Sequence, residues 1–199
     1  MTGLTAQIIA DVVKFHGHMC PGLALGIRAA EVAWAQVGVN SPENPIIAIV
    51  ETDLCPADAI QYLTGCTFGK GNLVHLDHGK NAFTFIRLRE GRGVRVVARP
   101  DAFGPPDPDF VALSERVRSG EASAGERARF DEIQRRRAET ILQMPIDRLF
   151  QVKTTEAHPP PRNRTMRWGV CDGCGEPVLI SHLEPQNGGS YCRGCLAGK

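Results

Sequence analysis

The stretch AFTFIRLREGRGVRVVA, residues 82–98, decides the fold predicted for this chain. Two runs rich in β-branched and aromatic residues, 82–88 and 94–98, flank the glycine-containing segment EGRG at 90–93. This pattern is typical of two antiparallel strands joined by a short turn. In a doubly wound parallel sheet, helices separate successive strands, so a hairpin argues against that architecture. The hairpin therefore favours a mixed α+β core.

Helical and strand patterns alternate on both sides of the hairpin. Upstream, apolar residues recur at steps of three and four, as on one face of a helix. These residues are Leu23, Ile27, Ala30, Trp34 and Val37. Further strands are expected at 46–50 and 73–76, and further helices at 5–15, 56–64, 105–118 and 124–143. Strands interleaved with helices in this way predict a single mixed core.

A proline-rich segment divides the chain into two parts. Residues 153–167 read KTTEAHPPPRNRTMR, with three consecutive prolines and almost no large apolar side chain. Such a segment is extended and acts as a spacer. We therefore expect an α+β core at 1–151, a linker at 152–167 and a small cysteine-rich domain at 168–199.

Composition restricts the class of protein. The 199 residues carry a formal net charge of +1, so no global basic field favours nucleic-acid binding. No apolar run reaches the length of about 18 residues expected of a membrane-spanning helix, and the first residues lack the pattern of a signal peptide. We expect a cytoplasmic protein, with no membrane partner, whose seven cysteines are reduced.

The last cysteines form the most specific motif. Cys171-x-x-Cys174 is followed, after 17 residues, by Cys192-x-x-Cys195. This spacing matches a four-thiolate zinc site of the zinc-ribbon or treble-clef-like kind. A domain this small cannot be stabilised by apolar burial alone, so zinc is expected to be structural there. The alternatives are two disulfides, which a reducing compartment disfavours, or four unrelated thiols.

A second cluster lies near the N-terminus. His16, His18 and Cys20 fall within five residues, and Pro21 suits the first position of the following helix. Cys20 would then be the N-cap, where the helix dipole and the imidazoles favour the thiolate. This cluster predicts a metal site or a thiol nucleophile; the alternative is a set of buried or capping side chains.

A similar Cys-Pro pair precedes the helix expected at 56–64. Cys55 is followed by Asp58 in its first turn, and Cys66 and Lys70 lie in a glycine-rich loop beyond that helix. The loop departs from the phosphate-binding P-loop in spacing, which excludes that motif. Asp58 is interpreted first as a helix cap and Cys66 equally as a ligand or a buried thiol. If the loops converge, His16, His18, Cys20, Cys55 and Cys66 would hold a second transition metal.

Three blocks of sequence resemble one known family. They are FHGHMCPGLALGIRAAEVA at 15–33, ETDLCPADAIQYLTGCTFGKGNL at 51–73 and DHGKNAFTF at 77–85. In this order they are similar to the FmdE family, which is named after formylmethanofuran dehydrogenase. Some members of that family also carry a C-terminal zinc finger. The resemblance implies an α+β core, an intertwined homodimer and metal binding by the residues named above.

Three functions are compatible with these patterns. The first is a metal-binding accessory protein or sensor for a molybdenum or tungsten enzyme system. The family is named after the operons of such enzymes. In this function the zinc tail would bind a protein partner. The second is an enzyme of unknown substrate that uses Cys20 with His16 or His18, and Lys70 or Asp58 as further candidate catalytic groups. The third is a transcriptional regulator acting through the zinc finger, which the near-neutral charge disfavours.

Overall fold

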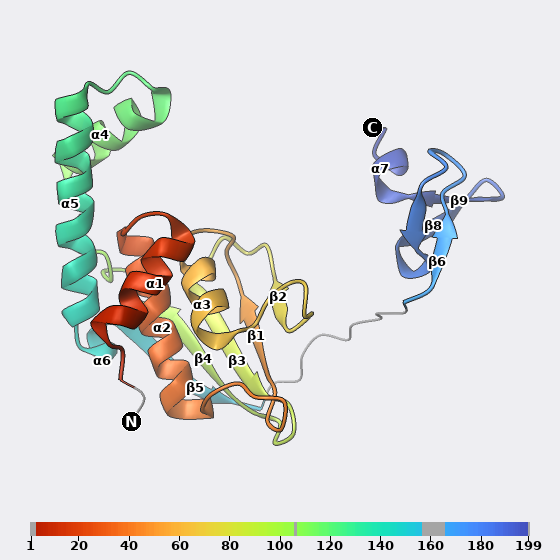
Figure 1. The fold of residues 1–199 in the computed structure, drawn as a ribbon, viewed down its shortest axis with the longest axis horizontal. Helices are drawn as coiled ribbons and strands as arrows, with labels where there is room; N and C mark the ends of the chain where they lie inside the picture. The colour runs from red at the N-terminus through yellow and green to blue at the C-terminus, as the bar shows by residue number, and fades with distance from the viewer. Residues whose placement is uncertain (1–2, 106, 157–165, 199) are drawn as a thin grey trace. The chain divides into compact units, whose positions relative to one another are not determined.

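Strand β1 (Ile46–Val50) lies inside a five-stranded sheet, and all of its residues are buried. The computed structural model describes residues 3–105, 107–156 and 166–198. The strand order is β2-β1-β3-β4-β5 (Figure 1). The remaining strands are β2 (Leu73–His75), β3 (Ala82–Arg87), β4 (Arg92–Ala98) and β5 (Phe150–Thr155). β1 and β2 are parallel and the other pairs are antiparallel, so the mixed α+β fold is confirmed.

The pleat of the sheet separates two apolar clusters. Ala48 pairs with Phe85 and Phe85 with Val94, and all three face the main core. Alternate residues of a strand point to opposite faces. Ile47 and Ile49 accordingly join a smaller cluster on the other face. The β3–β4 hairpin expected from the sequence is therefore present and contributes to the main core.

Helix α2 organises the helical layer. It contacts β3 and β4 of the sheet and packs against both α3 and α5 (Figure 1). The helices of the core are α1 (Ala6–His16), α2 (Pro21–Val37), α3 (Pro56–Thr64), α4 (Pro108–Ser119), α5 (Ala124–Gln143) and α6 (Ile146–Leu149). The predicted helix at 105–118 thus begins later, at Pro108, where the Asp107 side chain caps the helix by accepting from the amides of Asp109 and Phe110. The described helices include none that combines the length and the apolar character needed to cross a bilayer.

The contact between α2 and α3 leaves no room for a side chain at Gly26. A Cβ atom built there would lie 2.3 Å from the Pro56 carbonyl oxygen and 2.9 Å from the Ala59 Cβ. At Gly22, one turn earlier, a Cβ would lie 3.1 Å from the Cys55 Cβ. Glycine at these positions lets the two helices approach backbone to backbone. The starts of α2 and α3 are therefore neighbours in space.

The core extends further along the chain than the sequence predicted. The expected core ended at 151, whereas β5 runs to Thr155 and pairs with β4 throughout, so residues 152–155 belong to the sheet and not to the linker. Most β5 side chains are exposed, because β5 is an edge strand. This explains why hydrophobicity did not reveal the strand. Of the expected linker, residues 157–165 lie outside the described part of the chain.

The C-terminal unit has two small antiparallel sheets. The chain divides into two compact units, Met1–Pro159 and Pro160–Lys199. The second contains β6 (Trp168–Val170), β7 (Pro177–Leu179), the 3-10 helix η1 (Ile180–His182), β8 (Leu183–Gln186), β9 (Gly189–Cys192) and α7 (Arg193–Leu196). β6 pairs with β7 and β8 with β9. This hairpin arrangement agrees with a zinc-ribbon-like domain.

We predict that Gly26→Ala destabilises the core. The new methyl group would overlap the Pro56 carbonyl, so α2 and α3 must separate. Overpacking of this kind costs about 1–3 kcal/mol of unfolding free energy. Gly125→Ala is the matched control, because a Cβ at Gly125 in α5 meets no atom within 4 Å. Urea denaturation of both variants would show whether only Gly26 is intolerant; equal stability of the two variants would contradict the packing argument.

Candidate metal centres

Cys20 is positioned by the start of α2. It is the N-cap of the helix, its backbone is extended, and Pro21 follows at the first helical position. The amide of Leu23 donates a hydrogen bond to the Cys20 Sγ at 3.3 Å. A residue that caps a helix through its side chain has that side chain fixed against the first turn. The N-cap role predicted for Cys20 is confirmed.

Cys55 lies at the start of α3 but does not cap it. Its side chain makes no capping hydrogen bond, and Pro56 again occupies the first turn. The close approach of α2 at Gly22 places Cys55 beside Cys20. The Cys55 thiol is thus free of the helix backbone and is directed by the contact between the two helices.

His16 completes a three-residue cluster. It is the last residue of α1, and Gly17 turns the chain there with a left-handed backbone (φ 100°). The His16 Nε2 lies 4.0 Å from the Cys20 Sγ. The ligand atoms of His16, Cys20 and Cys55 all lie within 4.8 Å of one another. Residues from three helices are therefore brought to one point.

Asp58 orients the imidazole. Its Oδ2 lies 2.7 Å from the His16 Nδ1 and accepts the Nδ1 proton. This leaves the lone pair of the ring on Nε2, which faces Cys20. A carboxylate behind a ligating histidine is a recurrent feature of metal sites, where it fixes the ring and raises its basicity. Asp58 was interpreted as a helix cap; instead its side chain supports His16.

The two thiols of the core cluster share one proton unequally. A hydrogen bond from Cys55, helped by the amides of Leu23 and Gly22 and opposed by burial, lowers the pKa of Cys20 to about 6. The same hydrogen bond to Cys20, together with burial, raises the pKa of Cys55. At neutral pH the pair is therefore a thiolate beside a thiol. A thiolate is the form of cysteine that binds a metal.

The donor set fits a transition metal with an open coordination position. In a tetrahedral zinc site, a sulfur and a nitrogen ligand lie about 3.6 Å apart, close to the separation of Cys20 and His16. Two thiolates and one imidazole are ligands that zinc, copper or iron accepts. Three protein ligands leave the fourth position of a tetrahedral ion free for water or another molecule.

The structure places His18 and Cys66 outside this cluster. The His18 ring packs against that of His16 in a tilted arrangement, with 4.7 Å between centroids, but it is not among the converging ligands. Cys66 is fully buried in the main core, where its thiol donates to the Ile46 carbonyl at 3.4 Å and burial raises its pKa. Cys55 and Cys66 bracket α3, a helix of nine residues, or roughly 13 Å. That length keeps the two thiols apart.

Lys70 lies with Cys66 at the far end of α3. Its Nζ would be 3.6 Å from a Cβ built on Gly65, the residue that ends α3. The proximity of the Lys70 charge also lowers the pKa of Cys66, although burial dominates there. Lys70 therefore does not reach the three-residue cluster at the start of the helix.

The four cysteines of the C-terminal unit converge as their spacing predicted. Their Sγ atoms all lie within 4.8 Å of one another, and Cys171 and Cys195 are 3.8 Å apart. Sulfur atoms around a tetrahedral zinc ion are also separated by roughly 3.8 Å. The amide of Cys192, followed by that of Cys174, lowers the pKa of Cys171 to about 6. The set is complete with four protein ligands, as in a structural site.

Comparisons with known proteins agree with this arrangement. The model of the family described as "FmdE, Molybdenum formylmethanofuran dehydrogenase operon" matches residues 15–151, which include all three ligands of the core cluster and Asp58. This match covers more than half of the chain. The chain belongs to the FmdE family.

Two relatives extend the comparison. A "Probable S-adenosyl-L-methionine-binding protein" of Archaeoglobus fulgidus is 31% identical over 185 residues, which cover 89% of this chain but only 50% of the relative. The chain therefore spans about half the length of that protein. The fold is also similar to the crystal structure of an FmdE-like protein of the tungsten formylmethanofuran dehydrogenase kind from Syntrophus aciditrophicus. That match has a TM-score of 0.60 and 23% identity, and covers 97% of this chain and 92% of the other.

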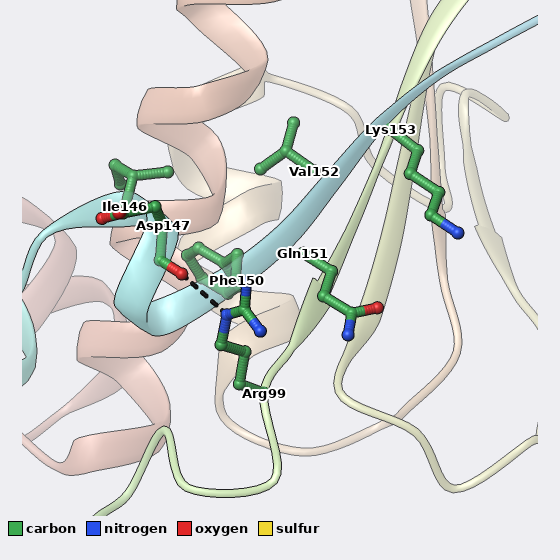
Figure 2. Close-up of a pocket in the computed structure, with 7 residues that line it drawn as sticks. All are labelled: Arg99, Ile146, Asp147, Phe150, Gln151, Val152 and Lys153. Atoms are coloured by element: carbon green, nitrogen blue, oxygen red, sulfur yellow. Dashed lines mark hydrogen bonds between the residues drawn. The ribbon is translucent and has the colours of Figure 1, made fainter.

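Another cavity of this FmdE-family chain is lined by none of the candidate metal ligands. It has a volume of about 770 Å³ and lies along β5 and α6 (Figure 2). At its wall, Arg99 donates a hydrogen bond from Nε to the Asp147 carbonyl at 2.7 Å. No cysteine or histidine is among the described residues that line it. The volume of a cavity alone therefore does not identify the candidate metal site of this protein.

A buried carboxylate that the sequence did not reveal anchors the segment before Cys55. Glu51 follows β1, and its side chain accepts from His78 at 3.1 Å and from Arg95 of β4. Burial raises the pKa of Glu51, but the hydrogen bonds and charges of His78 and Arg95 outweigh it, and the net pKa is lowered. Glu51 and His78 are 27 residues apart, so no local spacing indicates the pair.

We predict that Glu51→Gln lowers the unfolding free energy by about 1–3 kcal/mol at pH 7, because a buried charged acceptor is lost. Since the pKa of Glu51 is lowered in the folded state, its contribution is present above the unfolded value and disappears as pH falls through the folded pKa. The difference between wild type and variant should therefore shrink in acid.

Urea denaturation between pH 7 and pH 3 measures this difference. Glu90→Gln is the control, since Glu90 is exposed and its ion pair with Arg92 is expected to contribute little. A difference between wild type and Glu51→Gln that stays constant over the whole pH range would contradict the assignment.

Proposed function

We propose that this FmdE-family chain is a metal-binding accessory protein with two distinct centres. The core centre binds one transition metal ion through His16, Cys20 and Cys55, and the C-terminal unit binds a structural zinc ion through its four cysteines. The observation that carries the proposal is the convergence of the three core ligands within 4.8 Å, with Asp58 behind His16. Buried structural thiols would not need a carboxylate-oriented imidazole beside them.

The open position of the core centre supports a role in handling metal. An ion held by three protein ligands has a water or another small molecule as its fourth ligand, which can exchange readily. An ion held by four protein ligands has no such exchangeable ligand. Delivery or sensing of a metal requires such exchange. The description of the family names a molybdenum enzyme operon, and the description of the similar crystal structure names tungsten. We therefore propose that this chain is an accessory protein of a molybdenum or tungsten enzyme system.

A metal-dependent enzyme is the second candidate. A cavity of about 380 Å³ is lined by both Cys20 and Cys55, so a small molecule can reach the ion that they bind. In that function the ion would activate water or a substrate, with His16 and the two thiols as its ligands. Lys70, a candidate catalytic group in the sequence, does not line this cavity. Turnover of a small molecule that depends on the core metal would favour the enzyme over the accessory role.

Partners and location remain predictions of the sequence. A homodimer and a protein partner for the zinc-binding unit are both proposed, and sedimentation of the full chain would test the first. We also propose a cytoplasmic location. Salt-sensitive DNA or RNA binding would instead support a regulator acting through the zinc finger.

We predict two metal equivalents per full-length chain by mass spectrometry. The double variant Cys20→Ser/Cys55→Ser should retain one, because the ligands of the C-terminal unit are intact. Cys66→Ala is the matched control and should retain both, since Cys66 lies in the apolar core. Two equivalents in the double variant would refute the core centre, whereas one equivalent in both wild type and double variant would leave metal only in the C-terminal unit.

We predict that Asp58→Asn weakens metal binding at the core centre without abolishing it. Loss of the carboxylate behind a ligating histidine typically lowers affinity about 10–100-fold. Competition with a chromogenic chelator measures this affinity. Asp53→Asn is the control, because Asp53 is exposed and close in sequence. Equal affinities of the two variants would show that Asp58 does not support the site.

A further inference from the structure

The cavity beside the core centre is built from several parts of the chain that are distant in sequence. Cys20 and Cys55 line it from the starts of α2 and α3, while Gln134 and Arg137 line it from α5. Phe103 and Phe110 add aromatic surface. Its volume of about 380 Å³ lies within the range of small-molecule sites, which are mostly apolar with a few polar groups.

Arg137 is held rigidly at the wall of this cavity. Its Nη2 donates a hydrogen bond to the Phe103 carbonyl at 2.8 Å, and its guanidinium lies 4.7 Å from the centre of the Phe110 ring. Phe110 is itself stacked on Phe130. A guanidinium fixed in this way is already oriented for a ligand and loses little freedom on binding.

One donor of Arg137 lacks a partner. The Nε atom is buried and has no hydrogen-bond partner among the described residues. That atom is enclosed by the protein and is not accessible from the cavity, but Phe103 accepts from only one of the other N–H groups of Arg137, and no described carboxylate forms an ion pair with it. A carboxylate suits a guanidinium because it accepts from two of its N–H groups at once.

The charges around the cavity also favour an anion. No aspartate or glutamate is among the described residues that line it. Asp58, the carboxylate that supports the core ligands, is occupied by His16. Asp131 of α5 lines a different cavity, together with His18 and Arg135. Cys20 and Cys55 also line this cavity, and when they bind a divalent ion their two negative charges are balanced, so the charge of Arg137 is left uncompensated in the metal-loaded cavity.

We propose that this cavity binds a small organic carboxylate, whose carboxylate group pairs with Arg137 and whose apolar body packs against Phe103 and Phe110 beside the core metal. The inference rests on the proposed metal centre and names the class of molecule that shares its pocket. Cys20 and Cys55 line the same cavity, so the bound molecule lies beside the ion that they hold. Gln134 and Asn81 supply the remaining polar contacts of the wall.

Calorimetric titration of the zinc-loaded full chain tests this proposal. The probes are benzoate, phenylacetate, 3-phenylpropanoate and hexanoate, each compared with its primary amide, which has nearly the same shape but no charge. At least one carboxylate should bind about 10-fold or more tightly than its amide. Binding of no carboxylate, or equal binding of acid and amide, would overturn the proposal.

Variants locate the binding at Arg137. Arg137→Met keeps much of the length of the side chain and removes the charge, so it should weaken carboxylate binding about 10-fold or more and leave amide binding unchanged. Arg136→Met is the matched control, because Arg136 is exposed on the same helix and does not line the cavity. Equal effects of the two substitutions would place the carboxylate elsewhere and overturn the proposal.

Zinc content separates this inference from the proposed function. Each protein is assayed for metal and by circular dichroism before titration. A wild-type core without zinc refutes the metal centre, whereas a zinc-loaded core that does not discriminate acid from amide refutes only the carboxylate site. If Arg137→Met fails to fold, the comparison of acid with amide on the wild type still decides the question.

Discussion

The backbone contact between α2 and α3 is the constraint on which the core site depends. Gly22 and Gly26 leave α2 without side chains where it meets α3, and Pro56 and Ala59 of α3 occupy the space. Both helices begin with a Cys-Pro pair, so bringing their starts together brings their cysteines together. The proposed metal ligands Cys20 and Cys55 are thus positioned by closely packed backbone. A larger residue at Gly26 would move one thiol relative to the other without touching either.

Local signals in the sequence were sufficient for most elements and for the four-cysteine set, whose spacing encodes its own geometry. Features that depend on distant contacts could not be obtained in this way. From its neighbouring sequence, Cys66 could be a ligand as readily as Cys55. It lies at the other end of α3, however, and the length of that helix places it in the apolar core. The contacts of Asp58 with His16 and of Glu51 with Arg95 join residues more than 40 positions apart. β5 escaped prediction because an exposed edge strand lacks the alternation of a half-buried one.

The two cysteine clusters differ in how their negative charge is balanced. Four thiolates around a divalent ion carry a surplus of negative charge, and in the C-terminal unit the amides of Gly173 and Cys192 point at the Cys171 sulfur to offset it. Two thiolates and a neutral imidazole balance a divalent ion completely. The core centre is therefore free to accept a neutral or weakly charged fourth ligand without a large electrostatic penalty.

The division of the chain also has an evolutionary consequence. The sheet that supports the core site ends with β5 at Thr155, and among the described residues no strand of the C-terminal unit pairs with it. His16, Cys20, Cys55 and Asp58 are all encoded before that point. A gene that lost or exchanged everything downstream would still specify every ligand of the core centre. The two halves are thus free to be inherited, duplicated or recombined separately.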